Sequence, residues 1–316
     1  MKTLPLVSVI VTTKNEEFNI SSCLKSLLSQ TYPQDKNEII VVDNNSTDKT
    51  KDIVEEFARG FTQLNLKVFN YGPERSAQRN YGIAKSSGEY FLYLDADMTL
   101  SKNVIKDCVD RITVIPAQAG IQSNNLVGLY ISEIVTGNSF WSKVRRFERS
   151  FYDGTVIDCV RFIKKEIFQK VGGFDENLTG PEDWDLDKKI RKACPVASDS
   201  SATGVGLIKT PIYHNEAEFN LKKYLTKKSY YAKNFDIYIS KWSRSDNFQS
   251  DGIKAKIDPD IKRQFGFYYR FLGVFIEKRK LVPSDDSGWK KILVHPILFG
   301  GILTLRILVG LKFLLR

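Results

Sequence analysis

The sequence YFLYLDAD, residues 90–97, runs from five apolar or aromatic residues directly into a pair of carboxylates. Such a run predicts a buried strand whose carboxyl end carries polar groups. On its N-terminal side, apolar β-branched runs alternate with amphipathic stretches. The predicted strands there are Leu6–Val11, Glu38–Asp43 and Leu66–Asn70, and the predicted helices are Asn19–Gln30, Asp48–Phe57 and Ser76–Ala84. This alternation predicts an α/β fold with a mostly parallel central sheet, right-handed crossovers and flanking helices.

The pattern changes after residue 97. The elements predicted there are a helix at Val104–Ile112, a strand at Leu129–Ile131, and helices at Phe140–Tyr152 and Glu182–Ile190. Residues 114–128 have no periodicity and no charge, which predicts an exposed insertion. The four cysteines lie far apart without a paired motif, so a disulfide framework is disfavoured and a reducing compartment is expected.

Polar clusters follow the first, second and fourth predicted strands, at Thr12–Glu16, Asp43–Ser46 and Asp95–Asp97. In open α/β sheets, ligands bind beyond the carboxyl ends of the strands, where loops and helix N-termini converge. A single cluster is equally typical of a capped loop. Three together predict a binding site, to which the first cluster contributes Asn15 and Glu16.

Asp95 and Asp97 are two residues apart at a strand end, so their side chains can approach one divalent cation. Carboxylate oxygens suit Mg²⁺ or Mn²⁺, which take phosphate oxygens as further ligands. Arg75 and Arg79 precede the pair and can hold the same diphosphate through forked hydrogen bonds. Asp43 can accept hydrogen bonds from a nucleotide base or ribose. The combination predicts a site for a metal-bound nucleotide.

Five motifs, in this order, resemble those of the family 2 glycosyltransferases. They are VSVIVTTKNEE (7–17), IIVVDNNSTDKT (39–50), RSAQRNYGIAKSSGEYFLYLDADM (75–98), VGGFDE (171–176) and GPEDWDL (180–186). The resemblance covers about residues 4–192 and implies the A-type fold, a nucleotide-binding α/β sheet. It further implies that Thr12 and Asp43 contact the nucleoside, Arg79 the diphosphate, Asp95 and Asp97 the ribose and metal, and that Asp183 is the general base. Lys14 stands where an aromatic residue often follows the first motif's threonines.

Glu182 and Asp183 begin a predicted helix, where acidic residues are also favoured by the helix dipole alone. An acceptor hydroxyl must lose its proton as it attacks, so a carboxylate near the metal is expected to act as general base. Likeness to the acidic pair of the family favours Asp183, with Glu182 beside it. One base and no evident nucleophile predict a single displacement with inversion.

His214, in Pro211-Ile-Tyr-His-Asn215, has two interpretations. An imidazole can complete a coordination shell beside two carboxylates, and some related A-type transferases use a histidine there. The alternative is a hydrogen-bonded loop histidine.

Residues 220–316 contain 20 Lys or Arg against 8 Asp or Glu, and so carry the whole basic excess of a chain with formal net charge +10. Aromatic residues interleave with these charges, a pattern that fits single-stranded nucleic acid or a membrane interface. The apolar stretch 292–315 favours the membrane. Its longest part without Lys or Arg, Ile292–Leu305, has 14 residues, whereas a full span needs about 20. An interfacial helix is therefore predicted, and a buried core helix is the alternative.

The sequence thus predicts a catalytic, nucleotide-sugar-binding domain at residues 1–219 and a basic helical region at 220–316 that ends in a membrane-associating helix. The predicted function is that of an inverting glycosyltransferase of cell-envelope polysaccharide biosynthesis, peripheral or monotopic at the cytoplasmic face of the membrane. The expected partners are a nucleotide-sugar donor, a lipid-linked or growing glycan acceptor and an anionic membrane surface, with Mg²⁺ or Mn²⁺ and without nucleic acid. The alternatives are a polyprenyl-phosphate glycosyl synthase, which needs no strong base, and a non-catalytic membrane- or nucleic-acid-binding protein.

Overall fold

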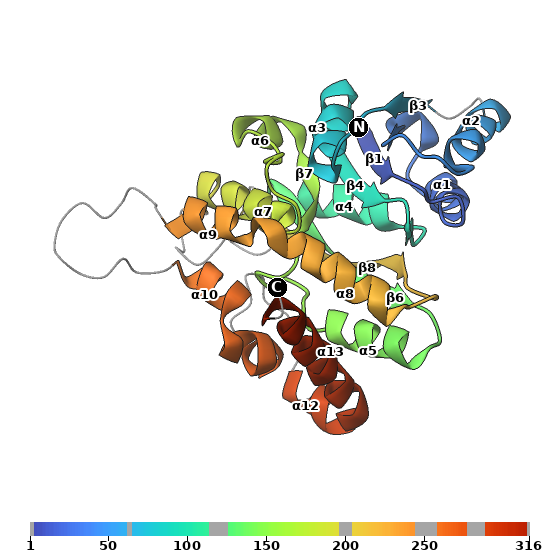
Figure 1. The fold of residues 1–316 in the computed structure, drawn as a ribbon. Helices are drawn as coiled ribbons and strands as arrows, with labels where there is room; N and C mark the ends of the chain where they lie inside the picture. The colour runs from blue at the N-terminus through green and yellow to red at the C-terminus, as the bar shows by residue number, and fades with distance from the viewer. Residues whose placement is uncertain are drawn as a thin grey trace.

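A single eight-stranded sheet forms the centre of the computed structural model, which describes residues 3–61, 65–113, 126–195, 204–243, 258–276 and 288–314. Its strand order is β3-β2-β1-β4-β7-β6-β8-β5 (Figure 1). The strands are β1 (Val7–Thr13), β2 (Asn37–Asp43), β3 (Asn65–Asn70), β4 (Tyr90–Asp95), β5 (Met98–Leu100), β6 (Gly128–Thr136), β7 (Val160–Lys164) and β8 (Val205–Asn215).

The four strands predicted in the N-terminal half are confirmed, and their neighbouring pairs are parallel. Every residue of β1 is buried, as expected for a strand covered on both faces. The register pairs Thr12 with Asp95 and Thr13 with Asp43. The carboxyl ends of these strands therefore meet at one edge of the sheet, and the three predicted polar clusters lie together there.

The second half of the sheet is mixed. β6 and β8 are parallel, but β7 runs antiparallel to both β4 and β6, and β5 runs antiparallel to β8. The sequence pattern predicted only that the sheet is mostly parallel. Antiparallel strands need no crossover helix between them, so the strand–helix alternation that revealed the first half gave no sign of this arrangement.

Helices cover both faces of the sheet. One face packs against α1 (Ile20–Leu28), α2 (Thr50–Gly60) and α4 (Val104–Thr113), and the other against α3 (Arg75–Lys85), α6 (Lys165–Lys170) and α7 (Glu182–Ala193). Each helix predicted before residue 194 is present within a few residues of its predicted bounds, including α5 (Phe140–Arg149). The predicted insertion lies largely outside the described residues, and its last residue, Gly128, begins β6.

The C-terminal region is helical, as predicted, and folds back onto the half of the chain that forms the sheet (Figure 1). Its elements are α8 (Leu221–Tyr231), α9 (Phe235–Ser243), α10 (Pro259–Phe265), a π-helix η3 (Tyr269–Gly273), α11 (Val274–Ile276), α12 (Gly288–Val294) and α13 (Pro296–Leu314). α13 packs against α5 and α8. Ile302 and Leu305 are buried in a cluster that also holds Val144 and Phe275.

The apolar stretch predicted as one helix is two. α12 ends before His295, and Pro296 begins α13, because proline lacks the N–H that would continue the first helix but is tolerated in a first turn. Among the described residues, no single helix has the length and apolarity to cross a membrane, and α12 and α13 meet that test only as a pair bent by 106°.

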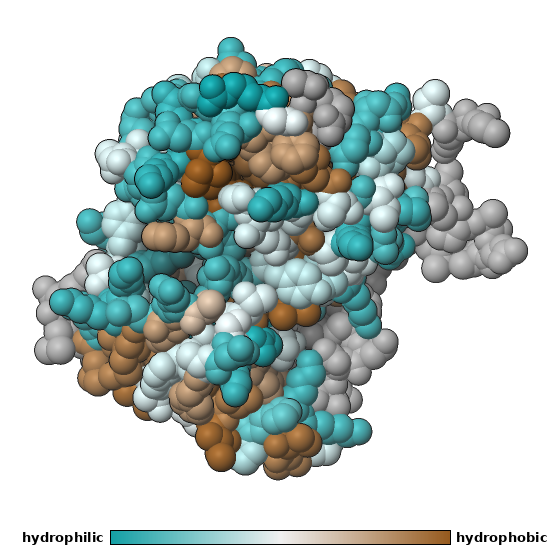
Figure 2. Space-filling model, turned by 90° about the vertical axis from the view of Figure 1, so that its right-hand side faces the viewer, coloured by the Kyte–Doolittle hydropathy of each residue, from teal (hydrophilic) through white to brown (hydrophobic). Residues whose placement is uncertain are grey.

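The predicted alternative of a core helix is confirmed for one face of α13, and association with a membrane stays a prediction. Ile297, Ile307 and Leu311 of α13 are exposed, as are Leu293 and Val294 of α12. Apolar side chains gather over the lower part of the face in Figure 2, the end of the molecule where these two helices lie.

Candidate active site

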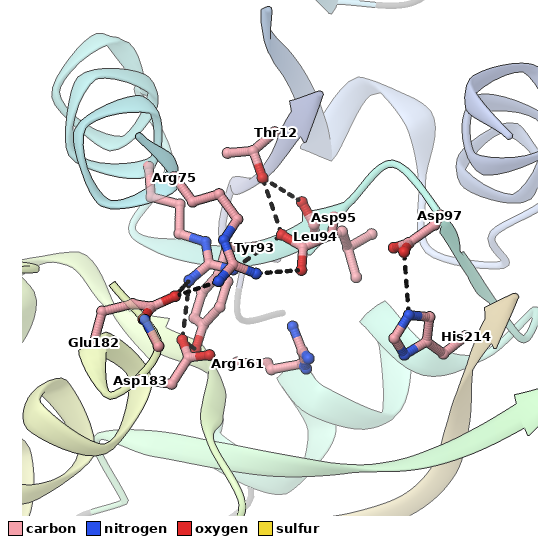
Figure 3. Close-up of polar contacts among 12 residues, drawn as sticks. Thr12, Arg75, Tyr93, Leu94, Asp95, Asp97, Arg161, Glu182, Asp183 and His214 are labelled. Atoms are coloured by element: carbon pink, nitrogen blue, oxygen red, sulfur yellow. Dashed lines mark hydrogen bonds and ion pairs between the residues drawn. The ribbon is translucent and has the colours of Figure 1, made fainter. Parts of the chain in front are cut away.

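A buried arginine joins the carboxylates at the sheet edge. Arg79, on α3, is 1% exposed. Its Nη2 atom lies 2.9 Å from Oδ1 of Asp95, and its Nη1 atom lies 3.0 Å from Oδ1 of Asp183 (Figure 3). The guanidinium also lies over the ring of Tyr93. Arg79 thus fixes the end of β4 to the start of α7, and its predicted contact with a diphosphate stays a prediction.

Glu182 and Asp183 differ in their environments, although they are neighbours at the start of α7. Glu182 is buried, and its Oε1 atom lies 2.9 Å from Nη2 of Arg75. Its carboxylate also accepts a hydrogen bond from the Gly180 N–H. Burial raises its pKa, and Arg75 opposes that rise. The Asp183 side chain is 23% exposed. Its Oδ1 atom accepts hydrogen bonds from Arg79 and from the Tyr93 hydroxyl, both at 3.0 Å, while Oδ2 bonds no described residue.

Asp95 is held as an anion. Burial by itself would raise the pKa of this carboxyl, but Arg79 and Arg75 outweigh burial and lower the pKa well below its usual range. The Thr12 hydroxyl donates a hydrogen bond of 3.1 Å to Oδ1, as the β1–β4 register allows. Arg75 is only partly buried and lies 3.7 Å from Oδ2.

Asp97 meets His214 because β5 pairs with β8, which places Met98 beside His214. Nε2 of the imidazole lies 3.1 Å from Oδ2 of Asp97 (Figure 3). The other ring nitrogen, Nδ1, lies 3.0 Å from Oε1 of Glu133. Burial lowers the pKa of His214, but the two carboxylates outweigh it and raise the pKa to about 10. His214 therefore lies on a strand rather than in a loop, and it bridges two carboxylates.

The side chains at this edge offer part of a coordination shell for the implied divalent cation. Among the described residues, no three His, Cys, Asp or Glu side chains are arranged to hold a metal ion. Asp97 nevertheless offers Oδ1, a buried oxygen that has no hydrogen-bond partner. Asp97 and His214 would together fit a Mg²⁺ or Mn²⁺ ion if the imidazole gives up the proton on Nε2 as the metal binds, with phosphate and water as the remaining ligands. Asp95 is the less available ligand, because its Oδ1 atom is bonded to Arg79 and Thr12.

The remaining predicted residues line the edge above β1 and β2. Asn15 has a left-handed backbone with φ of 55°, and its side chain accepts a hydrogen bond of 2.8 Å from the Thr47 N–H. Glu16 accepts a hydrogen bond from Asn19. Asp43 is buried and holds Ser46 through both the backbone N–H and the hydroxyl. These bonds shape the two loops beside the carboxylates.

A cavity of about 220 Å³ opens at the carboxylates. Asp95, Asp183 and His214 line it from the half that forms the sheet, and Lys227 and Tyr231 of α8 line it from the basic region. The sequence did not predict that α8 reaches this cavity.

Three residues of the site were not predicted from the sequence: Tyr93, Glu133 and Arg161. Arg161 donates to Oε2 of Glu133 at 3.1 Å, and Glu133 in turn holds His214. Glu133 and Arg161 each interrupt an apolar strand run, LYISEIV and CVRFI, and a charge inside a buried strand needs a partner. A charged residue within an apolar strand therefore indicates that a partner exists, but the sequence does not identify that partner. Tyr93 gave no signal at all, since a tyrosine in an apolar strand is ordinary.

The model of glycosyl transferase family 2 matches residues 8–172, more than half of the chain. The chain therefore belongs to glycosyl transferase family 2, and its enzyme class is glycosyltransferase.

Two curated relatives cover the same region. Glycosyltransferase AglE of Haloferax volcanii is 30% identical over 193 residues, which make up 60% of this chain and 63% of that protein. An enzyme of Methanococcus voltae, named a dolichyl N-acetyl-alpha-D-glucosaminyl phosphate 3-beta-D-2,3-diacetamido-2,3-dideoxy-beta-D-glucuronosyltransferase, is 27% identical over 206 residues, 59% of this chain and 61% of that protein. The chain thus spans less than two thirds of the length of either relative.

A solved structure extends the likeness to almost the whole chain. A mannosyltransferase of Pyrobaculum calidifontis, in complex with GDP-Man and Mn²⁺, aligns with 98% of this chain and 81% of its own, with a TM-score of 0.56 and 21% identity. This likeness establishes the A-type fold.

Proposed function

We propose that this chain is an inverting glycosyltransferase that moves a sugar from a nucleotide-sugar donor to a hydroxyl of a lipid-linked or growing glycan acceptor, with a divalent metal. The observation that carries the proposal is the environment of Asp183. Arg79 and Tyr93 hold its Oδ1 atom, while Oδ2 bonds no described residue and the side chain lines the cavity.

In the proposed reaction, Oδ2 of Asp183 accepts the proton of the acceptor hydroxyl as that oxygen attacks the sugar. The bond between the sugar and the nucleotide diphosphate breaks in the same step. Arg75, which lines the cavity, lies within reach of the leaving group. A divalent cation held by Asp97 and His214 would neutralise the charge that develops on the diphosphate.

A single displacement is favoured because the cavity offers no activated nucleophile among the described residues. Cys159 lines it, but burial raises the pKa of its thiol to about 12, so the thiol stays protonated at neutral pH. Asp95 is bonded to Arg79 and Thr12 through one oxygen. Attack by the acceptor itself inverts the sugar centre.

The name of the Methanococcus voltae relative describes transfer onto a dolichyl-linked sugar phosphate, which supports a lipid-linked acceptor and a role in cell-envelope glycans. The proposed location is the cytoplasmic face of the membrane, as a peripheral or monotopic protein, because nucleotide sugars are cytosolic. Exposed Ile297 and Leu311 on α13 and the basic surface of residues 220–316 support this location.

A second candidate is a polyprenyl-phosphate glycosyl synthase. The basic wall of the cavity favours it, since Arg145, Lys227 and Lys228 would attract an acceptor phosphate. A phosphate oxygen is already ionised and needs no base, so the two functions differ in their requirement for Asp183.

A panel of uridine and guanosine diphosphate sugars, titrated with and without Mn²⁺, tests the proposed function. We expect at least one donor to bind more tightly with the metal, and slow hydrolysis of that donor to release its nucleotide. If no nucleotide sugar binds under either condition, the proposal is wrong.

A further inference from the structure

A second cavity, of about 500 Å³, lies behind the candidate active site. We call it the rear chamber. Residues of α8, α10, η3 and α13 line it, and Phe235, Phe265 and Phe271 make much of its wall apolar. Trp184 and Lys228 line both cavities, so the rear chamber continues from the cavity that holds Asp183.

Positive charge is concentrated where the two cavities meet. The described lining of the rear chamber contains five cations, Arg145, Arg149, Lys228, Arg270 and Arg306, and one carboxylate, Glu148. Glu148 is already bonded to Arg145 and Arg306. The chamber therefore holds a marked excess of positive charge beside an apolar surface.

Part of this charge lacks a partner. Lys228 and Arg270 form no ion pair with any described residue, and Nζ of Lys228 lies over the ring of Tyr224. Arg306 is 9% exposed, and its Nη1 atom is buried without a hydrogen-bond partner. Buried cationic groups are costly unless they are paired. These groups would be compensated by an anion in the chamber.

We propose that the rear chamber binds the lipid carrier of the acceptor, a single-chain isoprenyl phosphate, with the phosphate at Lys228, Arg270 and Arg306 and the apolar chain along Phe265 and Phe271. The assignment rests on the proposed function, because it identifies the lipid carrier of the acceptor. Neither part of the site by itself selects this ligand. Cations alone would take any phosphate, and an aromatic wall alone would take any apolar chain.

The order of the groups along the two cavities fits this ligand. The reacting hydroxyl or phosphate must lie at Asp183, and Lys228 lies on the shared wall between Asp183 and the apolar part of the chamber. A carrier phosphate at Lys228 thus places its chain away from the donor. The volume of the rear chamber, about 500 Å³, lies within the range of roughly 300–1,000 Å³ that is typical of ligand pockets. The chamber can therefore hold part of one isoprenyl chain.

Farnesyl phosphate is a suitable probe, and tryptophan fluorescence can report its binding because Trp184 lines the chamber. Farnesol and inorganic phosphate test the two halves of the ligand separately, and vesicles of phosphatidylglycerol test the bilayer as an alternative source of lipid phosphate. We expect farnesyl phosphate to bind at least tenfold more tightly than farnesol or phosphate, and the vesicles not to displace it.

Two pairs of variants of the full chain locate the site. Gly310 lines the chamber, and a Cβ atom added there meets no atom within 4 Å, so Gly310→Phe adds a bulky side chain at the chamber wall. Gly300 on the same helix has equal space and lies outside the described lining, so Gly300→Phe is the matched control. Lys228→Gln removes the central cation, and exposed Lys223→Gln on the same helix is its control.

Gly310→Phe should weaken both farnesyl phosphate and farnesol at least fivefold, whereas Lys228→Gln should weaken only farnesyl phosphate. Both controls should bind like the unaltered chain. The proposal is overturned if inorganic phosphate binds as tightly as farnesyl phosphate, or if Gly310→Phe leaves binding of farnesyl phosphate unchanged. Nucleotide-sugar binding is measured on the same samples. A chain that binds the donor but not the isoprenyl phosphate contradicts this inference alone, and a chain that binds no donor contradicts the proposed function.

Discussion

The Tyr93 hydroxyl donates a hydrogen bond of 3.0 Å to Oδ1 of Asp183, across 90 residues of sequence. Tyr93 is fully buried on β4, and Asp183 is the second residue of α7. Together with Arg79, this bond fixes one oxygen of the carboxylate and leaves the other, Oδ2, free of bonds to described residues. Asp183 is therefore presented to the cavity in a defined orientation, whereas Glu182 is bonded to Arg75.

Asp183→Asn should retain donor binding and lose transfer. The amide keeps the shape of the side chain but cannot accept the proton, and a general base contributes typically about 10² to 10⁴-fold. The measurement is single-turnover transfer by purified protein, with donor affinity from calorimetry on the same batch. If turnover stays within a factor of about three of the unaltered chain, another group is the base, or the acceptor is a phosphate that needs none.

Tyr93→Phe should lower kcat and leave the KM for the donor nearly unchanged, because the tyrosine positions Asp183 and does not touch the donor. A hydrogen bond to a charged group is worth about 1.5–3 kcal/mol, which corresponds to roughly ten- to a hundredfold in rate.

Tyr130→Phe is the matched control for this change. Tyr130 is equally buried and donates to Asp187, outside the described lining of the cavity. An equal loss of kcat in both variants, or a change in the KM for the donor as large as the change in kcat, would mean that Tyr93 only supports the core.

Asp97→Ala should abolish the part of nucleotide binding that depends on Mn²⁺. The substitution removes Oδ1, the buried oxygen without a partner, and leaves His214 as the remaining proposed ligand. Calorimetric titration of the nucleotide with Mn²⁺ and with a chelator separates the metal-dependent part from the rest. Unchanged affinity in Mn²⁺ would contradict the metal assignment.

Replacement of Ile297, Ile307 and Leu311 by Gln should release the protein from anionic vesicles while nucleotide binding persists. Burying each of these side chains is worth roughly 1.5–3 kcal/mol, so the salt-resistant part of vesicle binding should fall by at least tenfold. Deleting α13 is the wrong test, because Ile302 and Leu305 are core residues. Phe18→Gln, at another exposed apolar residue, is the control, and equal flotation of both variants would remove the basis for membrane association.

Binding of farnesyl phosphate should weaken as pH rises above about 7. Burial, together with the nearby cations Arg145, Arg270 and Lys227, lowers the pKa of Lys228 to about 7 against the opposing effect of Glu148. Lysine is charged below its pKa, so the cation that attracts the phosphate is lost at higher pH. Unfolding returns Lys228 to a pKa near 10.5. Between about pH 7 and pH 10.5 the unfolded chain therefore binds more protons than the folded chain, so the free energy of unfolding should rise with pH in this range.

Lys228→Arg keeps the charge at all these pH values, because arginine does not lose its proton in proteins. Its affinity for farnesyl phosphate should stay nearly constant between about pH 6 and pH 9, measured by the same fluorescence titration. A parallel decline in Lys228→Arg and the unaltered chain would show that the ligand, and not Lys228, titrates.

Local pattern in the sequence determined the first half of the sheet, its helices and the position of the carboxylates at strand ends. Each of those features depends on neighbours a few residues away: the β-branched run of β1, the helical spacing of α1, and the apolar strand that ends at Asp95. The pattern also predicted that the carboxyl ends of these strands share one edge of the sheet, but the strand order that pairs Thr12 with Asp95 came from the structure.

Only the tertiary structure decided which charged groups, distant in the sequence, form pairs with one another. The pairing of β5 with β8 joins Asp97 to His214 across 117 residues, and α13 returns to place Arg306 against Glu148 across 158. Sequence pattern marks such charges as needing partners, because burial of an unpaired charge is costly, but it does not name the partners. Long-range packing also placed α8 over the cavity and split the apolar C-terminal stretch at Pro296, because those arrangements depend on surfaces that exist only after the chain has folded.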